Sequence, residues 1–387
     1  MATTSRLPTA IRGLLGAAIG LAATVAILWA GLGILRDEDG PERLVLGFYT
    51  LIGATGAAEA IRSYGLHPMG AKTVTAAVAI FVGVGGVWAL FTAANLLTDR
   101  LGPRFERLVR PWVFTGPALA LVAFYLLFPT LRTILISATE DGGLVANYAF
   151  VFTDRDMLIA LRNNALWLIF GTSGSVLIGL GFATLVDRVR REAIAKTFIF
   201  LPLSISMVGA AVIWRFVYYW RPPGEEQIGL LNGLLAGLGY EPVAFFQSVP
   251  LNTFALIAIM VWLQTGFAMV VLSAAIKAVP QTLLEAARID GAGELQIFRS
   301  VIIPSIRGSL ITVGTTIFIA ILKVFDIVFV TTGGKFQTDV VANRMFKEMI
   351  RFRNDGRASA LAVILLVAVI PIMVVNVRNL RRQGVGS

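Results

Sequence analysis

The 387-residue sequence contains no cysteine, which excludes disulfides, thiolate metal ligands and cysteine nucleophiles. Its one histidine, His67, argues against a histidine-based metal centre or catalytic triad. Charged residues make up only 14% of the chain, whereas soluble domains carry about 25%. Hydrophobic residues make up 57%, and these proportions exclude a soluble globular protein, a disordered chain and a coiled coil. They predict an integral membrane protein.

Apolar runs long enough to cross a bilayer as a helix, about 20 residues, occur eight times. They cover 13–35, 74–97, 112–135, 163–186, 197–219, 252–276, 310–332 and 358–377. The first run is longer than the hydrophobic region of a signal peptide, so we expect an uncleaved anchor. The segment 44–61 is shorter and interrupted by glycines, and we interpret it as an external re-entrant or interfacial segment. The expected fold class is an all-α integral membrane protein with about eight transmembrane helices.

The net charge of +10 chiefly indicates how the chain is oriented in the membrane. Cytoplasmic loops of membrane proteins carry an excess of Lys and Arg, and this rule places 1–12, 99–110, 187–196, 277–309 and the C-terminal tail inside. Both termini are then cytoplasmic. The loop 333–357 falls outside although it carries six basic and three acidic residues, and we expect it to fold against another segment.

The longest cytoplasmic loop, 277–309, has the pattern of a helical hairpin. Pro280 suits the first turn of a helix over 281–289, because its missing N–H costs nothing there. Gly291 offers the positive φ that ends a helix, and a second helix over 294–301 runs to Pro304. From the residues alone, a docking element and a simple link between two spans are equally good interpretations.

The run EAARIDGAGELQIFRSVIIP in this loop resembles the EAA loop of ABC importer permeases nearly position for position. In that family the loop seats in a cleft of a cytoplasmic ATPase and transmits its closure to the spans. The resemblance implies a coupling role for the following residues: Glu285, Ala286, Ala287, Asp290, Gly291, Ala292, Gly293 and Pro304.

The resemblance extends over 111–382. GLLNGLLAGLG is similar to the family's external segment, and FDIVFVTTGG at 325–334 is similar to its FD…TxGG run, although Lys335 stands where a proline is common. The chain looks most like the larger permease subunit of maltose and α-glucoside systems. This implies a six-helix type I importer core at 111–382 and an N-terminal extension at 1–110. It also implies a cell-membrane complex with a second, different permease, an ATPase pair and an external solute-binding protein.

No segment matches the phosphate loop GxxxxGK followed by Ser or Thr. We therefore expect no enzyme activity and no cofactor on this chain, with ATP and Mg bound by the partner ATPase. The excess of basic residues does not indicate nucleic acid, because it is accounted for by orientation in the membrane.

Polar side chains within the spans are candidates to line a solute pathway, because they are costly when they face lipid. In the sixth span these are Gln264 and Thr265, flanked by Trp262 and Phe267; an aromatic ring beside an amide suits a sugar ring. Ordinary helix packing is an equally good interpretation of this region. In and after the seventh span the candidates are Thr315, Thr316, Lys323 and Asp326. For Lys323 and Asp326 an ion pair on one helical face is the favoured alternative.

Other residues near the outer ends of spans have ordinary structural interpretations. Asn163 and Asn164 are candidate helix caps at the start of the fourth span, and Arg215 is expected to extend to the interface. The aromatic residues at the end of the fifth span are typical of an interfacial belt; they are Trp214, Tyr218, Tyr219 and Trp220.

The solute is open between maltose-like or trehalose-like disaccharides, other glucosides and glycerol-phosphate-type solutes. A secondary transporter is the rival from another class, but it would place carboxylates in mid-membrane, and only Asp326 is near that depth. An ion channel would need a repeated filter segment, and a membrane enzyme would need clustered His, Asp or Glu. A scaffold would leave the EAA-like loop without a role.

Overall fold

The computed structural model describes residues 118–384, except Arg188 and Pro223, together with scattered positions between 73 and 116. The chain divides into two compact units between Pro129 and Thr130, and most of the described residues belong to the second unit. The predicted spans 13–35 and, apart from a few positions, 74–97 lie outside the described residues, as do segment 44–61 and His67. The predicted division at 110/111 stays a prediction.

The described residues form helices and turns, with no strand among them. The longer helices are α6 (Phe128–Thr139), α7 (Gly143–Thr153), α8 (Arg155–Leu166), α9 (Thr172–Val186), α10 (Glu192–Phe200), α11 (Met207–Val217), α12 (Leu230–Gly237), α13 (Leu251–Lys277), α14 (Gln281–Ile289), α17 (Arg307–Leu322) and α20 (Asp355–Gly384). Shorter helices are α15 (Glu294–Ile297), α16 (Ile303–Ser305), α18 (Asp326–Thr331) and α19 (Val341–Phe346). Single turns of π- or 3₁₀-helix at 123–127, 167–171, 201–204, 298–302 and 347–351 adjoin them.

Four continuous helices in the described part of the chain are long and apolar enough to cross a membrane. They are Ala118–Thr139, Arg155–Val186, Leu251–Lys277 and Asp355–Arg378. Two bent pairs, 192–204 with 207–217 and 294–305 with 307–322, bring the number to six if each pair is one span. The predicted all-α membrane class is confirmed.

The structure corrects two of the predicted spans. The span 197–219 turns by 103° after Ser204, where Pro202 lies in a 3₁₀ turn and the hydroxyl oxygen of Ser206 accepts a hydrogen bond from Gly209 N as the cap of α11. The span 310–332 is wrong at its C-terminal end, because α17 stops at Leu322 and residues 326–331 form the separate helix α18.

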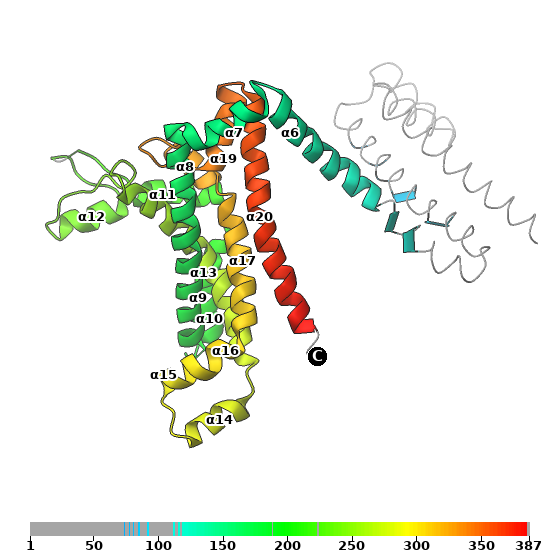
Figure 1. The fold of residues 1–387 in the computed structure, drawn as a ribbon. Helices are drawn as coiled ribbons and strands as arrows, with labels where there is room; N and C mark the ends of the chain where they lie inside the picture. The colour runs from blue at the N-terminus through cyan, green and yellow to red at the C-terminus, as the bar shows by residue number, and fades with distance from the viewer. Residues whose placement is uncertain are drawn as a thin grey trace, which may run out of the picture. The chain divides into compact units, whose positions relative to one another are not determined.

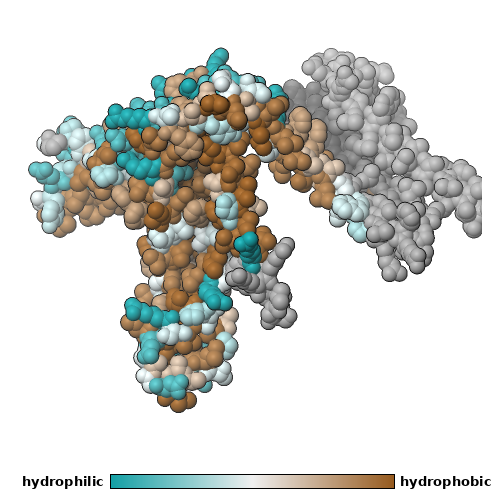
Figure 2. All heavy atoms as spheres, in the orientation of Figure 1, coloured by the Kyte–Doolittle hydropathy of each residue, from teal (hydrophilic) through white to brown (hydrophobic). Residues whose placement is uncertain are grey.

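The second unit is a helical bundle with different structures at its two ends (Figure 1). Helices α9, α10, α13 and α17 run side by side, α20 runs along them, and the α14–α15 hairpin lies at one end. Helices α7, α12 and α19 lie at the opposite end. Figure 2 shows hydrophobic residues along the bundle and hydrophilic residues gathered towards both ends, as a membrane-spanning bundle requires.

Helix α13 is the centre of the bundle, and a large share of its residues is buried. It packs closely against α9 at Gly179, where a Cβ atom would lie 2.5 Å from Ala268 Cβ and 3.1 Å from Thr265 O. Small residues of this kind let membrane helices approach closely, where dispersion contacts hold them together. The contact of α9 with α13 therefore depends on the absence of a side chain at Gly179.

We predict that Gly179→Ala destabilises the folded chain by about 1–3 kcal/mol, because the added methyl group overpacks the contact. The measurement is the thermal unfolding midpoint of the detergent-solubilised protein. Gly181→Ala is the matched control, since it lies on the same helix and a Cβ atom there meets nothing within 4 Å. Equal midpoints for the two variants would contradict the close contact.

Candidate functional site

The EAA-like loop folds as the helical hairpin that its sequence indicates. Helix α14 follows Pro280 and ends before Gly291, whose φ of +79° is the left-handed conformation expected at that position. The second helical segment begins at Glu294 and continues through a π-helical turn to Ser305. The hairpin is joined across its turn by an ion pair of 3.3 Å between Arg288 Nε and Glu294 Oε1.

The outer face of the hairpin is exposed, and it carries apolar side chains beside the EAA-like residues. Ile289 is 85% exposed and Leu295 62% exposed, while Glu285 and Asp290 are also open to solvent. Its inner face contacts the bundle, because Ile297 is buried and Leu284 packs against the main core. An exposed apolar surface on a hairpin anchored in this way is typical of a protein-docking surface.

A cluster of charged groups lies at the end of the bundle from which this hairpin extends. Lys196 Nζ lies 2.7 Å from Asp187 Oδ1 and 2.6 Å from Glu192 Oε1. Ser273 Oγ donates to Asp187, and Lys277 pairs with Glu192. These groups belong to the end of α9, the start of α10 and the end of α13, so the three helix ends are held together where the chain enters the hairpin.

In the middle of the bundle, the predicted pathway residues fall into two groups. Thr265 is buried and its hydroxyl donates to Val261 O at 2.6 Å; those of Thr315 and Thr316 likewise donate to carbonyls of their own helix. Gln264 is half-buried and forms no hydrogen bond with the described residues. Of the two polar pathway residues on α13, Gln264 is therefore the one whose side chain is free to form a hydrogen bond with a solute.

The structure does not bring all the predicted pathway residues together. Trp262 and Thr265 line a cavity of about 640 Å³ between α9, α10 and α13, and the Trp262 ring packs edge-on against Trp214 at 5.8 Å. Phe267 packs against the same core. Lys323 instead lines a separate cavity of about 590 Å³ formed by α17, α19 and α20.

The expected ion pair between Lys323 and Asp326 is wrong. Helix α17 ends at Leu322, so Lys323 and Asp326 do not share a helical face. Neither side chain forms an ion pair anywhere in the part of the chain that the structure describes. Lys323 is exposed and Asp326 half-buried in the first turn of α18.

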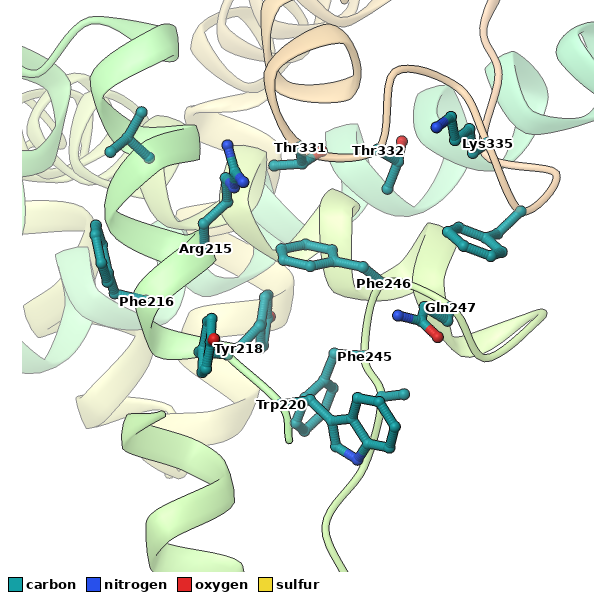
Figure 3. A pocket seen from close by; sticks show the side chains of 14 residues that line it. Arg215, Phe216, Tyr218, Trp220, Phe245, Phe246, Gln247, Thr331, Thr332 and Lys335 are labelled. Atoms are coloured by element: carbon teal, nitrogen blue, oxygen red, sulfur yellow. The ribbon is translucent and has the colours of Figure 1, made fainter. Parts of the chain in front are cut away.

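A pocket of about 540 Å³ at the opposite end from the hairpin was not anticipated from the sequence (Figure 3). It lies between the end of α11, the loop around Phe246 and the turn after α18. The side chains that line it include Arg215, Phe216, Tyr218, Tyr219, Trp220, Phe245, Phe246, Gln247, Thr331, Thr332, Lys335 and Phe336. The sequence contains an aromatic run at 214–220 and a Thr-Thr-Gly-Gly run at 331–334, but nothing in it shows that the two meet.

Tyr218 is a fixed wall of this pocket rather than part of an interfacial belt. Only 5% of it is exposed, its ring packs between Phe245 and Phe246, and its hydroxyl donates to Ala255 O at 3.2 Å. Trp214 also packs against this ring, at 4.9 Å.

The turn after α18 is clamped by buried asparagines, which corrects the expected capping role of Asn163 and Asn164. Helix α8 is capped by Asp154 and begins at Arg155, so both asparagines lie inside it. Asn163 Nδ2 donates to Gln337 O at 2.7 Å and to Asp339 O at 2.8 Å, and Asn164 Oδ1 accepts from Val341 N.

Asn252 at the start of α13 completes the clamp by donating to Phe336 O at 2.7 Å. Phe336 and Gln337 have φ values of 54° and 58°, a left-handed conformation that side-chain-bearing residues rarely adopt. Such strained backbone persists only where the surroundings hold it, and it is found mostly at functional sites. The asparagines therefore fix the wall of the pocket that Phe336 forms.

The basic loop 333–357 folds against the bundle, as its charge pattern predicts. Arg344 pairs with Glu348 at 3.0 Å and with Asp156 of α8 at 3.4 Å, and Lys347 pairs with Asp339 at 2.6 Å. Glu348 is buried, and burial raises the pKa of its carboxyl although Arg344 acts in the opposite direction. Two of the loop's six basic residues, Arg344 and Lys347, are thus paired with carboxylates.

Residues 175–383 match the family model described as the binding-protein-dependent transport system inner membrane component. The chain is 53% identical to the osmoprotective compounds uptake permease protein GgtC of Synechocystis, over 70% of this chain and 99% of that protein. It is 41% identical to the alpha-glucoside transport system permease protein AglF of Rhizobium meliloti, over 81% of this chain and 99% of that protein.

A solved structure with the same fold belongs to a bacterial ABC transporter involved in the import of the acidic polysaccharide alginate. It aligns with a TM-score of 0.62 at 19% identity and covers 72% of this chain and 99% of that one. A second structure of the alginate transporter, in complex with an alginate pentasaccharide-bound periplasmic protein, aligns with a TM-score of 0.61 at 20% identity over 73% and 98% of the two chains.

We predict that Asn163→Ala destabilises the protein by about 1–3 kcal/mol, because two buried carbonyl groups lose their hydrogen-bond donor. The thermal unfolding midpoint of the purified protein measures this loss. Gln296→Ala is the control, since Gln296 is an exposed side chain on the hairpin. If Asn163→Ala unfolds at the same temperature as Gln296→Ala, the hydrogen bonds of Asn163 do not stabilise the turn after α18.

Proposed function

The chain belongs to the family of inner membrane components of binding-protein-dependent transport systems, and on that premise we propose that it is the permease subunit of an ATP-driven importer of a glucoside or oligosaccharide. It forms half of the translocation pathway and lies in the cell membrane with both termini in the cytoplasm. The observation that carries the proposal is the exposed EAA-like hairpin, which is anchored to the most buried helix of the bundle.

The solute class is supported by the relatives that align over nearly their whole length. AglF is named for alpha-glucoside transport, and the identity of 41% extends over 99% of that protein. The aromatic side chains beside the free amide of Gln264 suit the same class, because sugars present both apolar ring faces and hydroxyl groups. We place the mid-membrane part of the pathway along α13 at Trp262, Gln264 and Phe267.

A second solute class is favoured by GgtC, which is named for the uptake of osmoprotective compounds. Its identity of 53% is higher than that of AglF, although it aligns with less of this chain. A small polar osmoprotectant would use the same pathway residues. Comparative uptake of a disaccharide and a small osmoprotectant separates the two classes.

The energy for transport enters through the hairpin. We infer that the exposed side chains of α14 dock into a cleft of a partner ATPase, which binds ATP and Mg. The charged cluster of Asp187, Glu192, Lys196 and Lys277 then links the hairpin to three helix ends at once. Closure of the ATPase moves these helices together only if the docked state favours one conformation of the bundle.

Three further partners complete the assembly: a second permease subunit, a second ATPase subunit and an external solute-binding protein. The periplasmic protein seen with the alginate transporter supports the last of these. We infer that the pocket at the opposite end from the hairpin faces this binding protein. Solute therefore enters at one end of the bundle, and the energy is delivered at the other.

We predict that Gly291→Ala weakens ATPase binding about tenfold or more, equivalent to 1.4 kcal/mol. The added side chain opposes the left-handed φ of +79° that sets the angle of the hairpin. Glu285→Ala should have a similar effect by removing an exposed charge from the docking face. Copurification of the ATPase with tagged permease measures binding, and ATP-driven glucoside uptake measures coupling.

Gly239→Ala is the matched control, because Gly239 has a φ of +81°, equally open surroundings and a position away from the hairpin. It should leave ATPase binding unchanged. If Gly291→Ala and Glu285→Ala also retain the ATPase and full uptake, the docking role of the hairpin is wrong.

A further inference from the structure

The pocket of Figure 3 has an unusual charge composition for its position. Seven of its lining side chains are aromatic, two are basic and none is acidic. Arg215 projects from the last turn of α11, and Lys335 from the turn that the asparagines clamp. In Figure 3 the Arg215 guanidinium and Lys335 lie along the edge that carries Thr331 and Thr332, while Trp220 and Phe245 lie along the opposite edge.

The two cations of the pocket are unpaired. Neither the Arg215 guanidinium nor the Lys335 ammonium group has a hydrogen-bond or ion-pair partner among the residues that the structure describes. Nearby carboxylates are paired with other bases, since Glu348 pairs with Arg344 and Asp339 with Lys347. The charges of Arg215 and Lys335 are therefore open towards the pocket.

The hydrogen-bond donors and acceptors of the lining indicate which chemical groups a ligand of this pocket would carry. Arg and Lys side chains only donate hydrogen bonds, which suits a carboxylate, phosphate or sulfonate group. The hydroxyl of Thr331 donates to Ile327 O at 2.6 Å, so towards a ligand it can only accept. Gln247 adds an amide that both donates and accepts. The lining therefore offers acceptors for sugar hydroxyls and two cationic donors for an anionic group, beside an aromatic surface.

The walls are rigid enough to act as a preformed site. Tyr218 is held by two aromatic contacts and a hydrogen bond to Ala255 O. The turn that carries Lys335 and Phe336 is held by Asn252 and Asn163. Prearranged aromatic and charged groups lower the entropic cost of binding a ligand.

We propose that this pocket is an outer solute subsite for an acidic glycoside, in which a pyranose ring lies on the aromatic wall and its anionic group lies between Arg215 and Lys335. This inference rests on the proposed function, and it narrows the solute from glucosides in general to those that carry a carboxylate, phosphate or sulfonate. The solute then passes from this subsite towards Gln264 on α13.

The absence of native cysteine in this chain allows a direct test of the local charge. Gln247→Cys is expressed in membrane vesicles together with the second permease and the ATPase. The cysteine is labelled with an anionic sulfonatoethyl or a cationic trimethylammonioethyl methanethiosulfonate, and the rates are compared for this subunit alone by mass spectrometry. Tyr240→Cys is the matched control, because Tyr240 is 65% exposed on a neighbouring loop and does not line the pocket.

We expect the anionic reagent to be favoured about tenfold more at position 247 than at position 240, from two unit charges close to the thiol in water. Adding Arg215→Gln and Lys335→Gln should remove this preference. Methyl α-D-glucuronide should slow the labelling severalfold. Methyl α-D-glucoside, which carries a hydroxymethyl group in place of the carboxylate, should not at the same concentration.

Three results would overturn the subsite. The first two are equal charge preference at the two positions and equal protection by the two glycosides. The third is no labelling at position 247 in the complex, which would mean that a partner subunit covers the pocket. ATP-driven uptake of maltose and of methyl α-D-glucuronide, measured in the same vesicles with the binding protein, separates this outcome from the proposed function, because uptake of either solute supports the importer role. Uptake without the charge preference would leave the importer role intact. Charge preference without uptake of either solute would contradict a role of the pocket in import.

Discussion

The fixed position of α13 is the constraint on which both ends of this structure depend. The helix can lie at the centre of the bundle because Gly179 leaves no side chain between it and α9. At one end Asn252 holds the strained turn at Phe336, and at the other end Ser273 and Lys277 join the charged cluster that leads into the hairpin. One continuous packed helix therefore joins the end of the bundle that leads into the hairpin to the turn that forms the wall of the outer pocket.

The parts of the fold that were predictable from the sequence are those set by local residues. Length and hydropathy give the membrane class, and Pro280 and Gly291 delimit α14 because each acts through its own backbone conformation. The charge pattern of 333–357 indicates a folded segment for a similar reason, since its ion pairs join residues such as Arg344 and Glu348 that are one helical turn apart.

The outer pocket and its clamp could not be predicted, because the residues that make them are distant in the sequence. Asn163 contacts Gln337 across 174 residues, and in an isolated sequence an asparagine at the edge of an apolar run is typical of a helix cap. Likewise, the break of α17 at Lys323 is not visible in a continuous apolar run. The pathway along α13 remains a hypothesis, since the side chains of α17 expected to face it hydrogen-bond to their own backbone.

The proposed import has two requirements: energy comes from a partner ATPase, and a glycoside crosses beside α13. The most direct test is glucoside accumulation by vesicles that hold the assembled transporter and its binding protein. With ATP inside the compartment that faces the hairpin, we expect accumulation, and an imposed proton or sodium gradient without ATP should give none. Accumulation driven by an ion gradient alone would contradict the central claim.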